Sequence, residues 1–261
     1  MTDRAARAAE LLLAARRDRR PLDGLPAELR PADLDEGYAI QRAFVEGRGV
    51  RPVGYKIGCT SELAQKALGI AEPVVGCALE PEVLQSPASF SASSFLQHFL
   101  EPEFAFRLAR DLPPRDAPYE QPEVTEAVDL TFPAIEIVAS GFGAAWSEVG
   151  AAQLIADNSA HALLILGEGR EDWRGLDLAA QAVSLEIDGA LATQGVGANA
   201  LGHPLRALTW LANDRVRRAE GLKAGDIVTT GVVTGLTDLC PGQKAVAHFG
   251  PIGRVEVDCA E

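Results

Sequence analysis

The chain has few cysteines and no long apolar run. Its 261 residues include four cysteines, with no C-x-x-C pair and no histidine at zinc-finger spacing. This argues against a disulfide scaffold and a structural zinc site, and it predicts reduced thiols in a cytoplasmic protein. Apolar runs such as residues 162–166 fall far short of the roughly 20 residues that a membrane-spanning helix needs. The cysteines are Cys59, Cys77, Cys240 and Cys259.

Positive charge is also in short supply. Lys and Arg number 24 against 37 Asp and Glu, which gives a formal net charge of −13. A nucleic-acid-binding protein presents a basic surface, so this balance argues against that class. With 47% apolar and 23% charged residues, the composition is that of a globular protein able to bury a full core.

The first 20 residues are rich in arginine, as a transit peptide would be. They also contain Asp3, Glu10 and Asp18 and lack serine. Transit peptides avoid acidic residues and are rich in serine, so we interpret this stretch as a mature amphipathic helix.

Two helices are predicted at the N-terminus. Residues 5–20 place Ala and Leu on one face with Arg opposite, and Pro21 ends the pattern. A second apolar stripe follows Pro31, where Asp33 can cap the helix. We therefore expect residues 1–50 to form a helical lead-in.

Residues 51–261 contain no repeat, low-complexity tract or linker, so we expect one mixed, strand-rich domain. Short or alternating apolar runs bounded by glycine and proline predict its strands, and 3.6-residue periodicity predicts its helices. The expected strands are 53–58, 99–108, 134–139, 183–187 before a hairpin turn at Asp188-Gly189, and three runs within 227–257; the expected helices are 61–68, 121–130 and 205–219.

Two glutamates lie two residues apart in one predicted strand, and a third lies in another. Glu101 and Glu103 project from the same face, close enough to hold one ion. Glu136 stands among isoleucine and valine, where an uncompensated carboxylate is costly and a divalent cation would satisfy it. Three oxygen ligands with open positions suit Mg²⁺ or Mn²⁺. The residues alone also allow Glu101 and Glu103 to face solvent while Glu136 pairs with an arginine.

Lys56 is a candidate proton carrier. It lies between Tyr55 and Ile57 in a predicted strand bracketed by glycines. Partial burial lowers the pKa of a lysine, so that it can exchange protons near neutral pH. The alternative is a surface lysine on an edge strand, because most lysines are exposed.

The four histidines are scattered, without H-x-x-x-H spacing. His203 precedes Pro204 and is expected to shape a turn or cap the next helix. His161 follows Asp157 by four residues and can reach a pocket lined by that segment, although histidine also has ordinary structural uses. The chain has neither a G-x-S-x-G elbow nor a complete dinucleotide fingerprint. The other histidines are His98 and His248.

Six short segments occur in a distinctive order: GYKIGCTS at 54–61, EPE at 101–103, PAIEI at 133–137, ADN at 156–158, LGHPL at 201–205 and LKAGDI at 222–227. In this order they resemble the 2-keto-4-pentenoate hydratase and 4-oxalocrotonate decarboxylase family, which belongs to the fumarylacetoacetate hydrolase superfamily. The resemblance runs from about residue 35 to the C-terminus.

This resemblance implies a fold and a site. The fold is α+β, a mixed β-roll or barrel-like sheet domain of the fumarylacetoacetate hydrolase C-terminal type, here with an N-terminal helical lead-in. The site would hold Mg²⁺ or Mn²⁺, with Lys56 in the place of the acid–base lysine. The resemblance puts Glu101, Glu103 and Glu136 in the metal-ligand positions, and Thr60, Asn158, Ser159, Thr230 and Gly231 in substrate-binding positions.

The chain departs from the family pattern in three places. Ser140 is followed by Gly141, where family members usually carry a Ser-Arg pair. Residues 157–160 read Asp-Asn-Ser-Ala instead of Asp-Asn-Ala-Ser, and residues 79–82 stand where an aspartate is expected. These departures bear on the substrate, whereas the metal-ligand positions are intact.

The activity implied is addition of water to a 2-hydroxy-2,4-dienoate in aromatic catabolism, which gives a 4-hydroxy-2-oxo acid. The metal would stabilise an enolate and Lys56 would move the proton. The alternatives are decarboxylation of a 2-oxo-3-enedioate and a non-catalytic subunit that supports a pathway enzyme. Apolar faces on the N-terminal helices predict a homo-oligomer, and a complex with a pathway enzyme is a further expectation.

Overall fold

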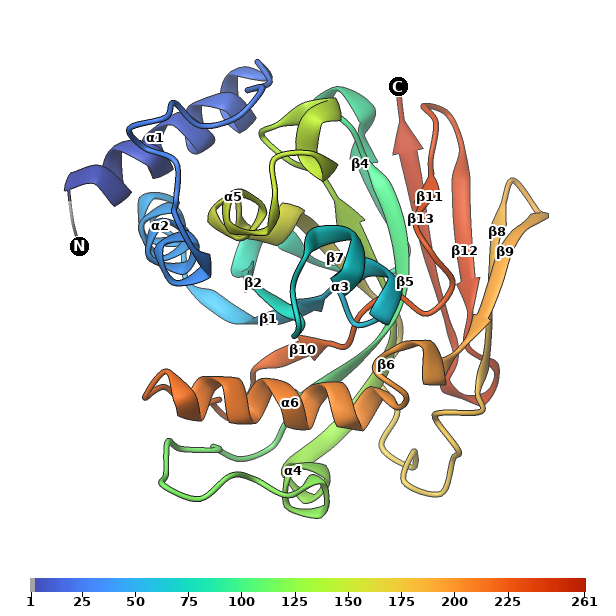
Figure 1. Cartoon of the computed structure of the whole chain (residues 1–261). Coiled ribbons are helices and arrows are strands. Elements are labelled where there is room, and N and C mark those ends of the chain that lie inside the picture. The colour runs from blue at the N-terminus through green and yellow to red at the C-terminus, as the bar shows by residue number, and fades with distance from the viewer. Residues whose placement is uncertain (1–2) are drawn as a thin grey trace.

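Two β-sheets and surrounding helices make up the computed structural model, which describes residues 3–261 (Figure 1). The helices are α1 Asp3–Asp18, α2 Leu34–Gly47, α3 Glu62–Leu68, α4 Gln121–Ala127, α5 Ala151–Ala156 and α6 Pro204–Arg217. The strands are β1 Pro52–Gly58, β2 Val74–Leu79, β3 Val83–Gln85, β4 Ala88–Ser91, β5 Phe99–Leu108, β6 Val128–Val138, β7 His161–Leu166, β8 Ala182–Ile187, β9 Ala190–Val196, β10 Ile227–Thr229, β11 Thr237–Asp238, β12 Lys244–His248 and β13 Arg254–Ala260. The expected α+β class is confirmed.

The two sheets enclose the main apolar core. The larger sheet has the order β2-β1-β10-β5-β6-β7-β3, with β11 on β5, and the smaller one, on the right in Figure 1, has the order β4-β13-β12-β8-β9. Phe104 on β5 meets Phe249 edge to face, with ring centroids 5.2 Å apart. Because side chains alternate along a strand, Glu103 next to Phe104 and Glu136 next to Ile135 project from the opposite face of the larger sheet.

The N-terminal helices pack against the rest of the chain. Asp33 caps α2 as expected, accepting a hydrogen bond from the Glu36 backbone N–H at 2.9 Å. The apolar face of α1 and α2 forms a cluster that includes Phe142 and Ala156. Residues on both sides of the predicted boundary at residue 50 therefore pack together.

Several local predictions are confirmed. Strands form close to the expected positions 53–58, 99–108 and 183–187, and α3 begins after Ser61, which caps it. His203 caps α6, its Nδ1 accepting from the Leu205 backbone N–H at 3.0 Å. All four cysteines are free thiols. Within residues 3–261, no helix combines the length and apolar character that crossing a membrane requires.

Other predictions were wrong in detail. The helix expected over 121–130 ends at Ala127, and β6 begins at Val128 instead of residue 134, because residues 128–133 pair with β5. The region 227–257 contributes four strands instead of three, one of which has only two residues. Strands β2, β3 and β4 were not expected, since short runs carry too little periodicity to identify.

Candidate metal centre and active site

Three glutamates converge on one face of the larger sheet. Glu101 and Glu103 lie on β5, and Glu136 lies on β6 directly opposite Glu101 in the antiparallel register. Directly paired residues share a face, as do residues two apart in one strand. One carboxylate oxygen of each glutamate lies within 4.8 Å of the others, a spacing that suits one metal ion. Glu103 and Glu136 are fully buried, and Glu101 is partly exposed.

Each fully buried carboxylate uses one oxygen within the protein and leaves the other free. The Gly231 backbone N–H donates to Glu103 Oε2 at 2.6 Å. His161 Nδ1 lies 2.8 Å, and Lys56 Nζ 3.4 Å, from Glu136 Oε1. Glu103 Oε1 and Glu136 Oε2 are buried without a hydrogen-bond partner among the described residues. Two such oxygens beside a third carboxylate fit a hard divalent cation.

The three carboxylates are costly when all are charged. Burial raises the pKa of Glu101 to about 7, with the charge of Glu136 adding to the shift and Lys56 opposing it. Burial and the neighbouring carboxylates raise the pKa of Glu103 well above its usual value. Burial also acts upward on Glu136, but Lys56 and the hydrogen bond to His161 outweigh it and lower its pKa. A bound cation would neutralise this concentration of negative charge.

Lys56 lies on β1 and is only 4% exposed. It pairs with Thr229 of β10, which pairs with Ala105 of β5, so Lys56 shares the face of Glu103. Burial lowers the pKa of Lys56, but the three nearby carboxylates, Glu136 foremost, raise it more and the net shift is upward. The expected lowering of this pKa is therefore wrong, because the carboxylates stabilise the ammonium.

Gly231 lies where any side chain would collide with Thr60. Its φ is +94°, and a Cβ there would lie 2.1 Å from Thr60 Oγ1. The absence of a side chain lets Thr60 pack against Gly231, whose N–H reaches Glu103. Thr60 is itself buried and lines the adjoining cavity.

A cavity of about 230 Å³ adjoins Lys56 and Glu101. Two hollows of about 570 and 590 Å³ lie elsewhere among the described residues, but none of the three glutamates nor Lys56 lines them. The cavity of about 230 Å³ is therefore the candidate substrate site, because Lys56 and Glu101 line it. Besides Lys56 and Glu101 it is lined by Gly58, Cys59, Thr60, Ser61, Ala64, Ala67, Leu68, Val74, Val138, Trp146, Ser147, Leu154, Ser159, Ala160 and Val232.

A left-handed turn joins α5 to β7 beside this cavity. The φ angles of Asn158, Ser159 and Ala160 are 53°, 52° and 59°. A non-glycine residue in this region costs on the order of 1–3 kcal/mol, so surrounding contacts must hold the turn. Arg16 supplies one set of them: its Nε donates to Asp157 Oδ1 and its Nη2 to the Asp157 carbonyl oxygen, both at 2.7 Å.

The turn is also tied to β2. The Asn158 amide accepts from the Cys77 N–H at 2.8 Å and donates to the Cys77 carbonyl oxygen at 2.9 Å. Ser159 Oγ donates to the Val75 carbonyl oxygen at 2.8 Å. Asn158 therefore has a structural partner, as has Thr230, whose Oγ1 donates to the Phe104 carbonyl oxygen at 3.1 Å. Substrate contacts by Ser159, Asn158, Thr230, Thr60 and Gly231 stay a prediction.

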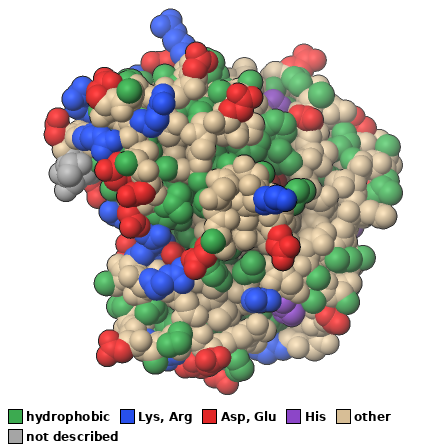
Figure 2. Space-filling view, viewed as in Figure 1, with side chains coloured by type: hydrophobic (Ala, Val, Ile, Leu, Met, Phe, Trp, Pro, Cys, Tyr) green, Lys and Arg blue, Asp and Glu red, His purple; other side chains and the backbone are tan. Residues whose placement is uncertain are grey.

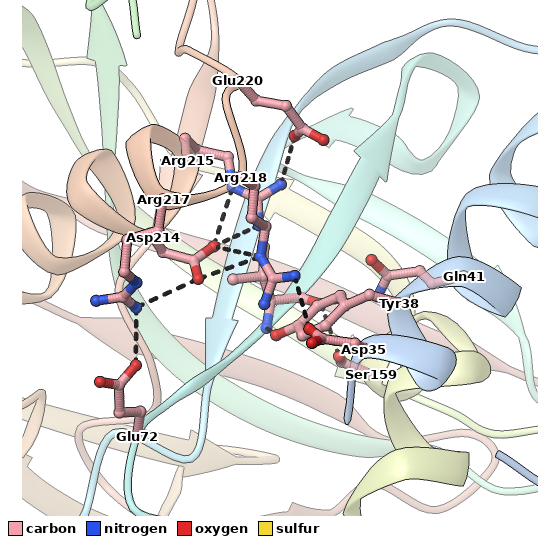
Figure 3. Close-up of polar contacts among 11 residues, drawn as sticks. Asp35, Tyr38, Gln41, Glu72, Ser159, Asp214, Arg215, Arg217, Arg218 and Glu220 are labelled. Carbon is pink, nitrogen blue, oxygen red and sulfur yellow. Dashed lines mark hydrogen bonds and ion pairs between the residues drawn. The ribbon is translucent and has the colours of Figure 1, made fainter. Parts of the chain in front are cut away.

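Helix α2 is hydrogen-bonded to β2, and the C-terminal end of α6 packs against α2 (Figure 3). The Val75 N–H donates to Tyr38 Oη at 3.1 Å, and Gln41 Nε2 donates to the Val75 carbonyl oxygen at 2.7 Å. The Arg218 guanidinium stacks on the Tyr38 ring, 3.9 Å from its centroid. Figure 3 shows the buried Asp214 carboxylate among three arginines at the C-terminal end of α6. Their contacts with Asp214 hold Arg218 against Tyr38. The arginines bound to Asp214 are Arg215, Arg217 and Arg218.

Three parts of this arrangement were not predicted from the sequence. His161 was expected to reach a pocket but was not connected with Glu136, and Arg16 was assigned no role. Thr229 Oγ1 is buried without a partner among the described residues, on the face of Lys56, whereas the neighbouring Thr230 was singled out. For Thr229 the missing information was which face of β10 it occupies, because a strand of three residues shows too little alternation to predict this.

The chain matches a known family and known relatives. Residues 82–260 match the family described as Fumarylacetoacetate (FAA) hydrolase C-terminal, and the chain belongs to this family. It is 32% identical over 254 residues to 2-keto-4-pentenoate hydratase of Paraburkholderia xenovorans (strain LB400), covering 96% of this chain and 93% of the relative. It is 34% identical over 253 residues to 2-keto-4-pentenoate hydratase 2 of Dechloromonas aromatica (strain RCB), covering 95% and 94%.

A solved structure supports the fold. This is 4-oxalocrotonate decarboxylase from Pseudomonas putida G7 complexed with magnesium and adipate, which matches with a TM-score of 0.91 and 23% identity over 99% of this chain and 98% of that one. The expected family is confirmed. A fold neighbour thus binds a divalent metal, and this chain has an acidic cluster able to hold one.

Proposed function

We propose that the chain is a metal-dependent hydratase that converts a 2-hydroxy-2,4-dienoate into a 4-hydroxy-2-oxo acid. The observation that carries this proposal is a cluster of three carboxylates, one of which, Glu101, lines a small cavity together with the buried amine of Lys56. The relatives with 32% and 34% identity are named 2-keto-4-pentenoate hydratase, and they extend over nearly the whole chain. Their name supports hydration of such an acid, and we propose that this reaction serves aromatic catabolism in the cytoplasm.

Glu101, Glu103 and Glu136 would hold the metal, and Mg²⁺ or Mn²⁺ suits this all-oxygen donor set. A bound divalent cation supplies Lewis acidity, drawing electron density toward the keto oxygen of a 2-oxo acid. Glu103 Oε1 and Glu136 Oε2 are available to bind the metal. The other oxygen of each carboxylate, Glu103 Oε2 and Glu136 Oε1, is already hydrogen-bonded within the protein.

Lys56 would carry the protons. Without a bound cation, the neighbouring carboxylates raise the pKa of Lys56 and favour the ammonium, which is the form that can donate a proton. In ketonisation the enol hydroxyl loses a proton and C5 gains one, which leaves a 2-oxo-3-enoate. Water then adds its oxygen to C4 and a proton to C3, and no other product forms. Lys56 can deliver one proton and receive the other, because its Nζ lies at the cavity wall.

The cavity favours a substrate with an apolar far end. Lys56 and Glu101 are the charged residues among those that line it, and both belong to the acidic site. The other walls are largely apolar, including Leu68, Trp146 and Leu154. Apart from Lys56 at the acidic site, no cationic side chain lines the cavity among the described residues, so a second carboxylate at the far end of the substrate would be left unpaired. This disfavours an enedioate, the substrate class of the decarboxylase alternative. At about 230 Å³ the cavity is smaller than the roughly 300–1,000 Å³ typical of drug-sized ligands, so it suits a short acid.

The direct test follows the ultraviolet absorbance of 2-hydroxypenta-2,4-dienoate. We expect the dienol absorbance to disappear when purified protein and Mg²⁺ or Mn²⁺ are present, with a 4-hydroxy-2-oxo acid as product. Lys56→Met should slow turnover at least about 100-fold, because a positioned acid–base group contributes 10²–10⁴-fold, and it should still bind the metal.

Other outcomes separate the alternatives. Release of carbon dioxide from a 2-oxo-3-enedioate, without hydration of the dienoate, would identify a decarboxylase. No turnover of either substrate by a protein that binds the metal would favour a non-catalytic subunit, especially if Glu136→Gln removed metal binding without affecting a partner enzyme. Absence of metal binding by the unmodified protein would overturn the proposed site.

A further inference from the structure

His161 makes a buried contact with one of the three glutamates. It is the first residue of β7, it is 1% exposed, and its Nδ1 lies 2.8 Å from Glu136 Oε1. A carboxylate oxygen accepts hydrogen bonds only, so Nδ1 carries the proton in this contact. Its other ring nitrogen, Nε2, is buried without a hydrogen-bond partner among the described residues. The imidazole is thus committed to Glu136.

An irregularity in the sheet turns His161 toward the site. Glu136 pairs with Leu164 and Ile137 with Leu163, but Val138 pairs with His161 instead of Ala162. Val138 projects from the same face as Glu136, and directly paired residues share a face. The bulge therefore places the imidazole on the carboxylate face, where a regular register would have placed the Ala162 methyl group. Bulges that redirect a side chain in this way occur often near active sites.

The backbone of His161 is held as firmly as its ring. Arg16 Nη1 donates to the His161 carbonyl oxygen at 2.7 Å, while the same guanidinium binds Asp157. Asp157 Oδ2 in turn accepts from Ser140 Oγ at 2.6 Å and from the Gly141 N–H at 2.8 Å. This network holds the backbone from which the imidazole projects toward Glu136.

The contact determines which oxygen of Glu136 is available. His161 Nδ1 and Lys56 Nζ both contact Oε1, and Oε2 has no hydrogen-bond partner within residues 3–261. Lys56 lies farther away, at 3.4 Å, on a flexible side chain. The contact from His161 is shorter, and its side chain has only two rotatable bonds. We therefore infer that His161 orients the carboxylate.

We propose that His161 is a positioning residue of the metal centre, whose Nδ1–H holds Glu136 so that Oε2 faces the cation. The inference rests on the proposed function for its metal, and it adds a residue that acts through Glu136 without touching the metal or the substrate. Hydrogen-bond partners of metal ligands contribute about 10–100-fold to metal affinity or activity. The same range is expected here for the dissociation constant of the metal.

The test is a calorimetric titration of the full chain with Mn²⁺ and with Mg²⁺, free of substrate. His161→Leu removes the donor and should weaken the dissociation constant about 10–100-fold. His161→Asn places an amide N–H close to the position of Nδ1 and should restore the affinity to within a few-fold. His161→Gln extends its amide toward the position of Nε2 and should not restore it.

A tautomer measurement gives a second, independent readout. With ¹⁵N-labelled histidine, long-range ¹H–¹⁵N correlation should show His161 protonated on Nδ1, and the chain has only four histidines to distinguish. His161 protonated on Nε2 alone would overturn the proposal.

The outcomes separate this inference from the proposed function. If the unmodified chain binds metal and Glu136→Gln does not, the metal site stands; equal affinity in the Leu, Asn and Gln variants would then overturn the role of His161 alone. If the Leu variant fails to fold, the Asn and Gln variants, both polar, still decide the matter, because only Asn should bind as the unmodified chain does. No metal binding by the unmodified chain would overturn both.

Discussion

Glu136 shows how one carboxylate can remain charged among isoleucines. Its ionised form is favoured because Lys56 and His161 meet one of its oxygens, which outweighs the effect of burial on its pKa. The second oxygen has no partner among the described residues. A buried anion with a free oxygen is unfavourable unless a cation is bound. The free oxygen of Glu136 is therefore destabilising without a metal and available to bind one.

Gly231→Ala should damage the site through two effects. The new methyl group would lie in a left-handed backbone conformation and would collide with Thr60, which moves the N–H that binds Glu103. We expect weaker metal binding by calorimetry and a loss of unfolding free energy in urea.

Gly235→Ala is the matched control for this change. Its φ is +102°, similar to that of Gly231, but no atom lies within 4 Å of the added Cβ. It should carry the backbone strain of about 1–3 kcal/mol alone, with metal affinity unchanged. Equal metal affinity in the two variants would show that the contact of Gly231 with Glu103 is unimportant.

At the scale of elements, α1 supports the active-site turn from a distance in sequence. Arg16 binds Asp157 and the carbonyl oxygen of His161, although 141 and 145 residues separate them. Gly141 lies against this helix: a Cβ there would make ordinary van der Waals contacts, 3.4 Å from the Ala15 Cβ and 3.5 Å from the Arg16 side chain. Gly141, which stands where the resembling family usually has an arginine, therefore lies next to Arg16 of α1.

Arg16→Met should lower the free energy of unfolding by about 3–5 kcal/mol, because it leaves the buried charge of Asp157 unpaired. Urea denaturation measures the loss. Arg17→Met is the control, since Arg17 is exposed and pairs with the exposed Asp18, and it should leave stability unchanged. A loss in Arg16→Met no larger than in the control would show that Ser140 and Gly141 alone sustain Asp157.

At the scale of the whole molecule, the N-terminal helices are part of the packed structure. Their apolar faces, expected to be buried by oligomerisation, are buried within the chain against Phe142 and Ala156. A homo-oligomer stays a prediction. Figure 2 shows Lys and Arg side chains interspersed with Asp and Glu on the face viewed.

A fragment of residues 51–261 should not fold stably. It would lack Arg16 for Asp157, and it would lose the hydrogen bonds of Tyr38 and Gln41 to Val75. We expect no cooperative thermal transition by circular dichroism, in contrast to the full chain. A fragment that melts cooperatively and binds metal would instead establish the boundary at residue 50 as a true domain boundary.

The metal-ligand candidates could be predicted from local spacing. Glu101 and Glu103 share a face because strand side chains alternate, and Glu136 was conspicuous because it interrupts an apolar strand. Helix caps at Asp33, Ser61 and His203 were equally local, since each acts within three residues of itself.

Contacts between distant segments depended on the tertiary structure. The Ala162 bulge that aims His161 at Glu136, the arrival of Arg16 at Asp157, and the carboxylates that raise the pKa of Lys56 all join residues far apart in the chain. Alternation and periodicity describe one segment at a time, so they predict which way a side chain points within its own strand. Register and packing between segments determine what that side chain meets.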